Sequence, residues 1–194
     1  MKKITSIIAI VALSIAFSSS AVAQSTPSTA TSVTSATIVA PIVITNLVKM
    51  NFGKFATTGA GTLTLDTNNG RLATDAVKVT GTGTNTATTA KLHVTGEPSY
   101  AYTISTPADF SLTTTSVIGG AIKTMAVSGF TLAFTAGTVV PFSTAGTLST
   151  TAVVDGPAAG TQDFYVGATL AVVADQAVGT YTSDAGFAVT VNYN

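Results

Sequence analysis

Apolar and polar side chains alternate along most of the chain, and this period of two predicts β-strands. The segments that alternate most clearly are MNFGKF (50–55), KLHVTG (91–96), YAYTIS (100–105), KTMAVSGFTLAF (123–134) and DFYVGATLAVVAD (163–175). No segment combines a capping residue with a helical period over a useful length. Short strands at this spacing predict an all-β chain, folded as a sandwich or a barrel.

Turn residues interrupt the alternation at two informative places. Asn69-Gly70 lies between the alternating arms TLTL (62–65) and RLATDAVKV (71–79), which favours a hairpin with a type I′ turn. Gly53 lies in the middle of MNFGKF, and it predicts a short strand with a bulge or bend at the glycine.

Both ends of the expected domain carry alternating strands. SATIVAPIVIT (35–45) is interrupted by Pro41, which cannot donate a ladder hydrogen bond and therefore places this strand at a sheet edge or divides it. The side chains on one of its faces are Ala36, Ile38, Ala40, Ile42 and Ile44. GFAVTVNYN (186–194) alternates to its last residues, as a strand inside a sheet does.

The first 23 residues are expected to be a secretory signal peptide. MKKITSIIAIVALSIAFSSSAVAQ has two lysines, an apolar run and an Ala-Val-Ala cleavage site before Gln24. Residues 24–35 are polar and of low complexity, which predicts a flexible leader. Residues 36–194 are expected to form one β-sandwich domain, within which residues 36–44 are a possible donor strand.

The composition excludes several classes of protein. Loss of Lys2 and Lys3 leaves six basic and eight acidic residues, a net charge of −2 that excludes a nucleic-acid partner. No later segment approaches the ~20 apolar residues of a spanning helix, so no stable membrane insertion is expected. The absence of cysteine excludes disulfides, thiolate metal sites and a cysteine nucleophile.

Few residues are of the types that act in catalysis or bind metals, and none of them forms a catalytic or metal-binding pattern. His93 is the only histidine and lies in an alternating strand, which favours a satisfied polar-face residue over a catalytic base. Asp66 begins a segment like the start of a calcium loop, but Val77 replaces the acid at the twelfth position, so a turn is favoured. We expect no enzyme activity, no catalytic residue, no metal and no cofactor.

The strand around Ala36–Thr45 has two interpretations that the sequence leaves equally open. An alternating strand after a flexible leader can be inserted into the sheet of another molecule. The same strand can also pair within its own sandwich. The two differ in their outcome, because a self-complete domain stays monomeric whereas a strand donor polymerises or needs a chaperone.

The order of several segments resembles a known family. ATIVAPIVIT (36–45), MNFGKF, GEPSYAYTIS (96–105), FYVGATLAVVADQAVGTYT (164–182) and FAVTVNYN (187–194) together resemble the secreted bacterial family called domain of unknown function 4402. More distantly, the layout is similar to spore-coat-protein-U-like subunits of archaic chaperone–usher pili. The chain departs from both patterns by carrying Ser183-Asp184-Ala185 before its last strand, and it lacks the cysteines common in the pilus relatives.

The resemblance implies an incomplete immunoglobulin-like antiparallel β-sandwich, completed by an exchanged N-terminal donor strand. A periplasmic chaperone would escort it to an outer-membrane usher. The protein would be periplasmic in transit and would then self-associate into a fibre at the cell surface, each copy donating its leader strand to the next. The donated side chains would be Ala36, Ile38, Ala40 and Ile42. The closing strand would offer Phe187, Val189, Val191 and Tyr193 to the chaperone or to a neighbouring copy.

Three functions remain open at this point. The first is a structural subunit of a fimbria or other surface fibre used in cell adhesion. The second is a self-contained secreted binding module, an adhesin or matrix protein that binds through the loops at 80–89 and 135–160. The third is a small outer-membrane β-barrel, for which paired aromatic girdles are not evident with 7% aromatic residues. A glycosidase with paired carboxylates and a lysine–asparagine crosslink helped by Glu97 have no specific pattern behind them.

Overall fold

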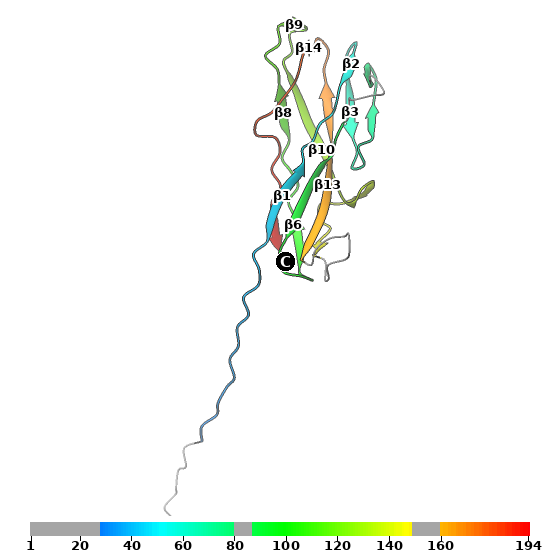
Figure 1. The fold of residues 1–194 in the computed structure, drawn as a ribbon. Helices are drawn as coiled ribbons and strands as arrows, with labels where there is room; N and C mark the ends of the chain where they lie inside the picture. The colour runs from blue at the N-terminus through cyan, green and yellow to red at the C-terminus, as the bar shows by residue number, and fades with distance from the viewer. Residues whose placement is uncertain (1–27, 80–86, 149–159) are drawn as a thin grey trace, which may run out of the picture. The chain divides into compact units, whose positions relative to one another are not determined.

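The computed structural model describes residues 28–79, 87–148 and 160–194, and this part of the chain contains strands and loops but no helix (Figure 1). All the strand pairs in it are antiparallel, and they form separate open sheets. The predicted all-β sandwich is confirmed. Among the described residues there is no helix with the length and apolar character needed to cross a membrane.

The larger sheet is built around two long neighbouring strands, β10 (Thr124–Thr135) and β13 (Thr161–Val172). Its other strands are β1 Val43–Val48, β3 Gly61–Leu65, β4 Arg71–Ala73, β6 Ala90–Thr95, β8 Phe110–Thr113 and β11 Thr138–Val140. The first half of β13 pairs with β6 and the second half with β3. The other side of β10 holds β8 and then β11. β1 lies beside β6, and β4 lies beside β3.

The remaining strands form one small sheet and two ribbons. β7 (Ala101–Ile104) is the centre of the small sheet, with β12 (Gly146–Thr147) on one side and β15 (Val191–Tyr193) on the other. The ribbons join β2 (Phe55–Thr57) to β5 (Val77–Val79), and β9 (Ile118–Gly119) to β14 (Ala177–Val178). In Figure 1 the β9–β14 ribbon lies at the top of the domain and the C-terminus lies at its lower end.

Two apolar clusters follow each other along the long strands. In the lower core, side chains of β6 and the first half of β13 pack against β7 and β15; its fully buried members include Val94, Tyr102, Phe164 and Val166. In the upper core, Leu63, Leu65, Val77 and Val127 are fully buried. The lower core therefore lies between two sheets. The upper core lacks a comparable second sheet in the described part of the chain, where a ribbon and the irregular segment before β15 face it.

The first strand of the domain starts later than the sequence predicts. Residues 28–42 form no strand, and β1 begins at Val43, where it pairs with Thr95. Pro41 explains the difference, because it has no N–H to donate to a ladder. Among the described residues β1 pairs only with β6 and so lies at the edge of its sheet, which is one of the two outcomes that the proline predicts, while the residues before Pro41 form no strand.

The hairpin between β3 and β4 is confirmed, but its turn is not type I′. Leu65 pairs with Arg71, so the loop contains the five residues 66–70. Asn69 has a left-handed φ of 64°, whereas Gly70 is not among the residues with positive φ. The Asp66 carboxylate accepts hydrogen bonds from the backbone N–H groups of Asn68 and Gly70, both at 2.7 Å, and this holds the longer loop.

Two further predictions concern Gly53 and the last strand. Gly53 has a φ of 72°, and β2 begins two residues later, which confirms the predicted bend. The last strand is shorter than the alternation of residues 186–194 predicts, because only Val191–Tyr193 pair with β7. Residues 186–190 are irregular and begin with Gly186, whose φ is 57°.

Candidate functional site

Two sheet edges without a partner strand in the described residues meet on one side of the domain. β1 pairs only with β6, and β15 pairs only with β7. An unpaired strand edge presents a row of free backbone N–H and C=O groups to which another strand can add.

The two edges are joined at the lower end by Ala40, Glu97 and Tyr193, a group that we call the Ala40 clasp. The N–H of Ala40 donates to Glu97 Oε2 at 3.0 Å, and the hydroxyl of Tyr193 donates to the carbonyl of Ala40 at 2.8 Å. The N–H of Glu97 in turn donates to the Tyr193 hydroxyl at 2.7 Å. Side chains thus satisfy both backbone polar groups of Ala40 and hold the chain beside the end of β15.

Above the clasp lies a groove of about 1560 Å³, which we call the open groove. Its floor is the inner face of the upper half of the larger sheet, with Leu112 from β8, Met125 from β10 and Leu170 from β13. One wall is formed by residues 46–57 and the other by residues 176–187. The groove therefore lies where a second sheet would cover the upper core.

Aromatic side chains close the groove at its lower end. Phe187 is the last residue of the second wall, and its ring centroid lies 5.4 Å from that of Phe130 and 6.4 Å from that of Phe110. Phe187 also packs against the lower core. At the other end the wall includes Val178 and Gly179, next to the β9–β14 ribbon.

The structure separates the four residues predicted as donated side chains. Ala36 and Ile38 lie outside every strand, and Ile38 is 98% exposed. Ala40 is held in the clasp, and Ile42 packs against the lower core of its own domain. Residues 28–39 thus lie outside every strand, whereas Ala40 and Ile42 contribute to the domain.

The four residues predicted as a closing strand face their own domain. Phe187 belongs to the aromatic group, Val189 packs against the lower core and Val191 is buried in it. Tyr193 belongs to the clasp. The feature of this segment that stays open is the backbone edge of β15, not its apolar side chains.

A polar cluster lies on the outer face of β6 and β13. Lys91 Nζ lies 2.7 Å from Asp163 Oδ2, and His93 Nδ1 lies 2.6 Å from Asp163 Oδ1. Burial by itself would raise the pKa of Asp163, but hydrogen bonds from Lys91 and His93 outweigh it and lower that pKa. The hydrogen bond to Asp163 raises the pKa of Lys91. The prediction of a satisfied polar-face histidine is confirmed.

No described residues form a metal site. No group of three histidine, cysteine, aspartate or glutamate side chains in the described ranges is placed to hold a metal ion. The Asp66 segment that begins like a calcium loop uses its carboxylate for the hairpin turn. Of the loops predicted for a binding module, 80–89 and 135–160, the parts at 80–86 and 149–159 lie outside the described residues.

Sequence reasoning missed two parts of this site. It considered Glu97 only as the helper of a lysine–asparagine crosslink and did not predict the contact of Glu97 with Ala40. It also placed Phe110 and Leu112 in no predicted strand, although they line the groove from β8. The alternation over residues 110–113 was the available signal for β8, but no sequence signal indicated which edge of the sheet would remain open.

The match to a family model covers most of the domain. The model described as domain of unknown function (DUF4402) matches residues 42–193, from just before β1 to the end of β15. No curated protein and no solved structure is significantly similar to the chain. The family match covers the groove and both open edges, and its description names no activity.

Proposed function

The chain belongs to the family described as domain of unknown function (DUF4402), and we propose that it is a non-enzymatic structural subunit of a bacterial surface fibre. In this proposal each copy donates the segment before its Ala40 clasp to the open groove of the next copy. The protein is secreted and passes through the periplasm, where a chaperone strand occupies the groove until an outer-membrane usher allows assembly.

The observation that carries the proposal is the open groove itself. Its floor consists of apolar side chains of the larger sheet, and a strand placed over them would cover the upper core. Such a strand could also pair with the free edge of β1, whose residues Asn46, Leu47 and Val48 line the groove. Backbone hydrogen bonds would give affinity, and alternate side chains would fill the groove. An apolar groove beside a free edge promotes aggregation until it is covered, which is the reason a chaperone is included.

The donated segment is shorter than the sequence predicts. Because Ala40 and Ile42 are engaged in their own domain, the donor ends at residue 39. Residues 28–39 provide an extended stretch without a strand partner, in which Val33 and Ile38 are each 98% exposed. Ala36 and Ile38 remain as donated side chains.

Deleting the donor up to residue 37 tests the proposal. A chain that begins at Gln24 is compared with one that begins at Ile38 and so keeps the clasp and β1. We expect the longer chain to form fibres in electron micrographs and a heat-sensitive ladder on denaturing gels, and the shorter chain to remain monomeric. In the longer chain, Ile38→Asp should lower assembly because it places a charge in an apolar groove.

The matched control is Val139→Asp on β11, a strand that neither lines the groove nor belongs to the donor. It adds the same charge at an exposed position and should leave assembly unchanged. The proposal is wrong if both chains stay monomeric with equal stability. It is also wrong if the chain that begins at Ile38 polymerises as well as the longer one.

A further inference from the structure

The end of the domain opposite the clasp carries a group of exposed apolar side chains. We call it the tip patch; its residues are Val117, Ile118, Ile122, Val173 and Val178. Val117 is 85% exposed, Ile118 is 68% exposed and Val178 is 64% exposed, and the last two face each other across the β9–β14 ribbon. Exposed clusters of large apolar side chains mark interaction surfaces.

Hydrogen bonds hold the backbone beneath the tip patch. The hydroxyl of Ser116 donates to the carbonyl of Val178. The carboxylate of Asp175 accepts a hydrogen bond from the N–H of Ala121 at 3.1 Å, and its carbonyl accepts one from the N–H of Ile122 at 2.9 Å. The patch is therefore a fixed surface and not the side of a loose loop.

We propose that the tip patch of one copy is covered by the clasp end of the copy that donates its leader to it. The contacting residues of the donating copy would be Val43, Glu97 and Tyr100, which lie around its clasp. This inference rests on the proposed function and adds to it a second contact between the domains of consecutive copies.

The direction of the donated segment leads to this contact. The open groove ends at Phe187 below and reaches Val178 above, so Val178 belongs to both the groove and the tip patch. The donated segment is clasped to its own domain at Ala40 and has no spare linker after residue 39. The donating domain must therefore lie directly against one end of the groove. Because the lower end is closed by aromatic side chains and by the acceptor's own clasp, that end is the upper one.

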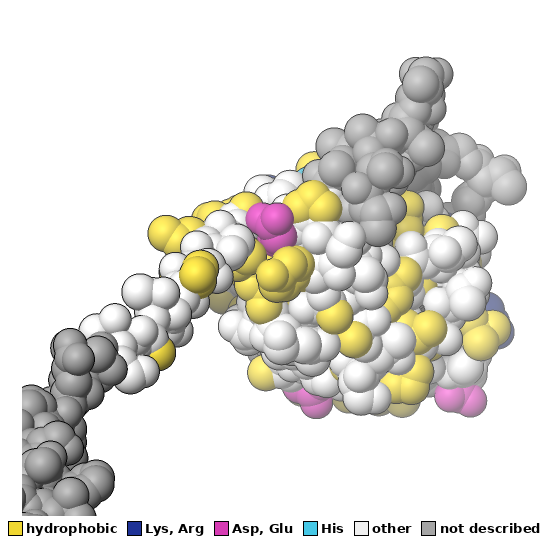
Figure 2. All heavy atoms as spheres, turned by 90° about the horizontal axis from the view of Figure 1, so that it is seen from below, with side chains coloured by type: hydrophobic (Ala, Val, Ile, Leu, Met, Phe, Trp, Pro, Cys, Tyr) yellow, Lys and Arg dark blue, Asp and Glu magenta, His cyan; other side chains and the backbone are white. Residues whose placement is uncertain are grey.

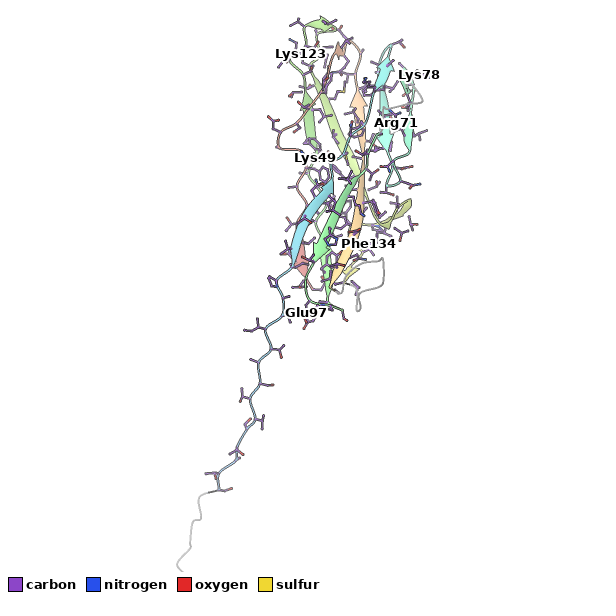
Figure 3. All side chains as sticks on the ribbon, in the orientation of Figure 1. Lys49, Arg71, Lys78, Glu97, Lys123 and Phe134 are labelled. Atoms are coloured by element: carbon purple, nitrogen blue, oxygen red, sulfur yellow. The ribbon has the colours of Figure 1, made fainter. Side chains whose placement is uncertain are left out.

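The two surfaces complement each other in charge and in apolar character. Figure 3 shows Lys123 at the tip and Glu97 at the opposite end of the domain. Lys123 forms no ion pair within the described ranges. Figure 2 shows the lower end, where hydrophobic side chains lie around an acidic one. Val43 is 48% exposed and Tyr100 is 44% exposed, so the clasp end offers apolar surface to the tip patch.

A cysteine cross-link tests this contact directly, because the natural chain has no cysteine. The chain carrying Ile118→Cys is mixed with the chain carrying Tyr100→Cys, allowed to assemble and treated with a short bis-maleimide. We expect a covalent dimer of the two variants. A mixture of the Val139→Cys and Tyr100→Cys chains is the control and should give no such dimer.

The outcomes separate this inference from the proposed function. If the mixture forms fibres and Ile118→Cys couples to Tyr100→Cys no more than Val139→Cys does, the end-to-end contact is wrong while strand donation stands. If neither mixture assembles, the proposed function fails and this inference fails with it.

Charged substitutions provide a second readout that does not depend on cross-linking. Val117→Asp combined with Ile118→Asp, two positions of the tip patch that do not line the groove, should make fibres dissociate roughly tenfold faster, because two apolar side chains lose their cover. Both residues are exposed in the single chain, so its unfolding midpoint should not change. Fibres as long-lived as those of Val139→Asp would overturn the inference.

Discussion

At the scale of single residues, the polar cluster of Lys91, His93 and Asp163 links stability to pH. The pKa of Asp163 is lowered from 3.8 by its hydrogen-bond donors, in spite of burial. Its stabilising contribution is therefore present above pH 3.8 and is lost as the pH falls through the lowered pKa. The pKa of Lys91 is raised from 10.5, so its contribution is complete below pH 10.5 and is lost as the pH rises through the raised pKa.

Asp163→Asn should lower the free energy of unfolding by about 0.5–1 kcal/mol at neutral pH, because the cluster is partly exposed to solvent. The difference from the natural chain should shrink as the pH falls through the lowered pKa of Asp163, because below it the carboxylate of the natural chain is protonated too. Urea unfolding across the acid range measures it. Asp109→Asn is the control, since Asp109 is exposed and forms no ion pair in the part of the chain that is described. A difference that stays constant with pH would contradict a role for the charge.

At the scale of elements, β10 and β13 run through both cores. The irregular segment before β15 marks the place where the small sheet stops and the open groove begins. The lower halves of the long strands are faced by β7 and β15, whereas their upper halves are faced by the groove. Phe187 lies at the transition, where it closes the groove and packs against the lower core.

Phe187→Ala should lower the free energy of unfolding by about 2–3 kcal/mol, because a partly buried aromatic side chain is removed from its contacts with Phe110 and Phe130. Phe187→Leu keeps most of the apolar volume and should cost less than half as much. Urea unfolding of the chain that begins at Ile38 measures both without interference from assembly. Equal effects of the two substitutions would show that the size of the aromatic side chain is not what matters.

At the scale of the whole molecule, the domain is a sandwich whose second layer is complete over the lower core alone. A ligand that binds the folded chain and not the unfolded chain raises the unfolding midpoint by mass action. The donated segment should act as such a ligand even when it is supplied as a separate peptide.

A peptide of residues 28–39, added to the chain that begins at Ile38 at ~100 times its dissociation constant, should stabilise the fold by about 2.7 kcal/mol. For a domain of this size that raises the melting temperature by roughly 5–10 °C, which calorimetry detects. A peptide of the same composition in scrambled order is the control. Equal shifts with both peptides, or no shift with either, would contradict strand binding in the groove.

The sequence by itself determined the strands, because alternation reports a local property. The buried faces of β6, β10 and β13 follow from which side chains are apolar along each strand, and the bend at Gly53 follows from the freedom of glycine. Pro41 marked the break before β1 for an equally local reason, the missing N–H. For the turn between β3 and β4, the sequence predicted the hairpin but not the turn type, since Asp66 rather than the Asn69-Gly70 pair sets the length of the loop.

The tertiary structure alone decided which edges stay open and which residues meet. The Ala40 clasp joins residues more than fifty positions apart, and it divides a stretch that alternates evenly in the sequence into a free part and an engaged part. The groove exists because residues 46–57 and 176–187 are held apart above the same sheet. A strand's alternation shows which face it buries but carries no information about its neighbour, because the neighbour is chosen by long-range pairing.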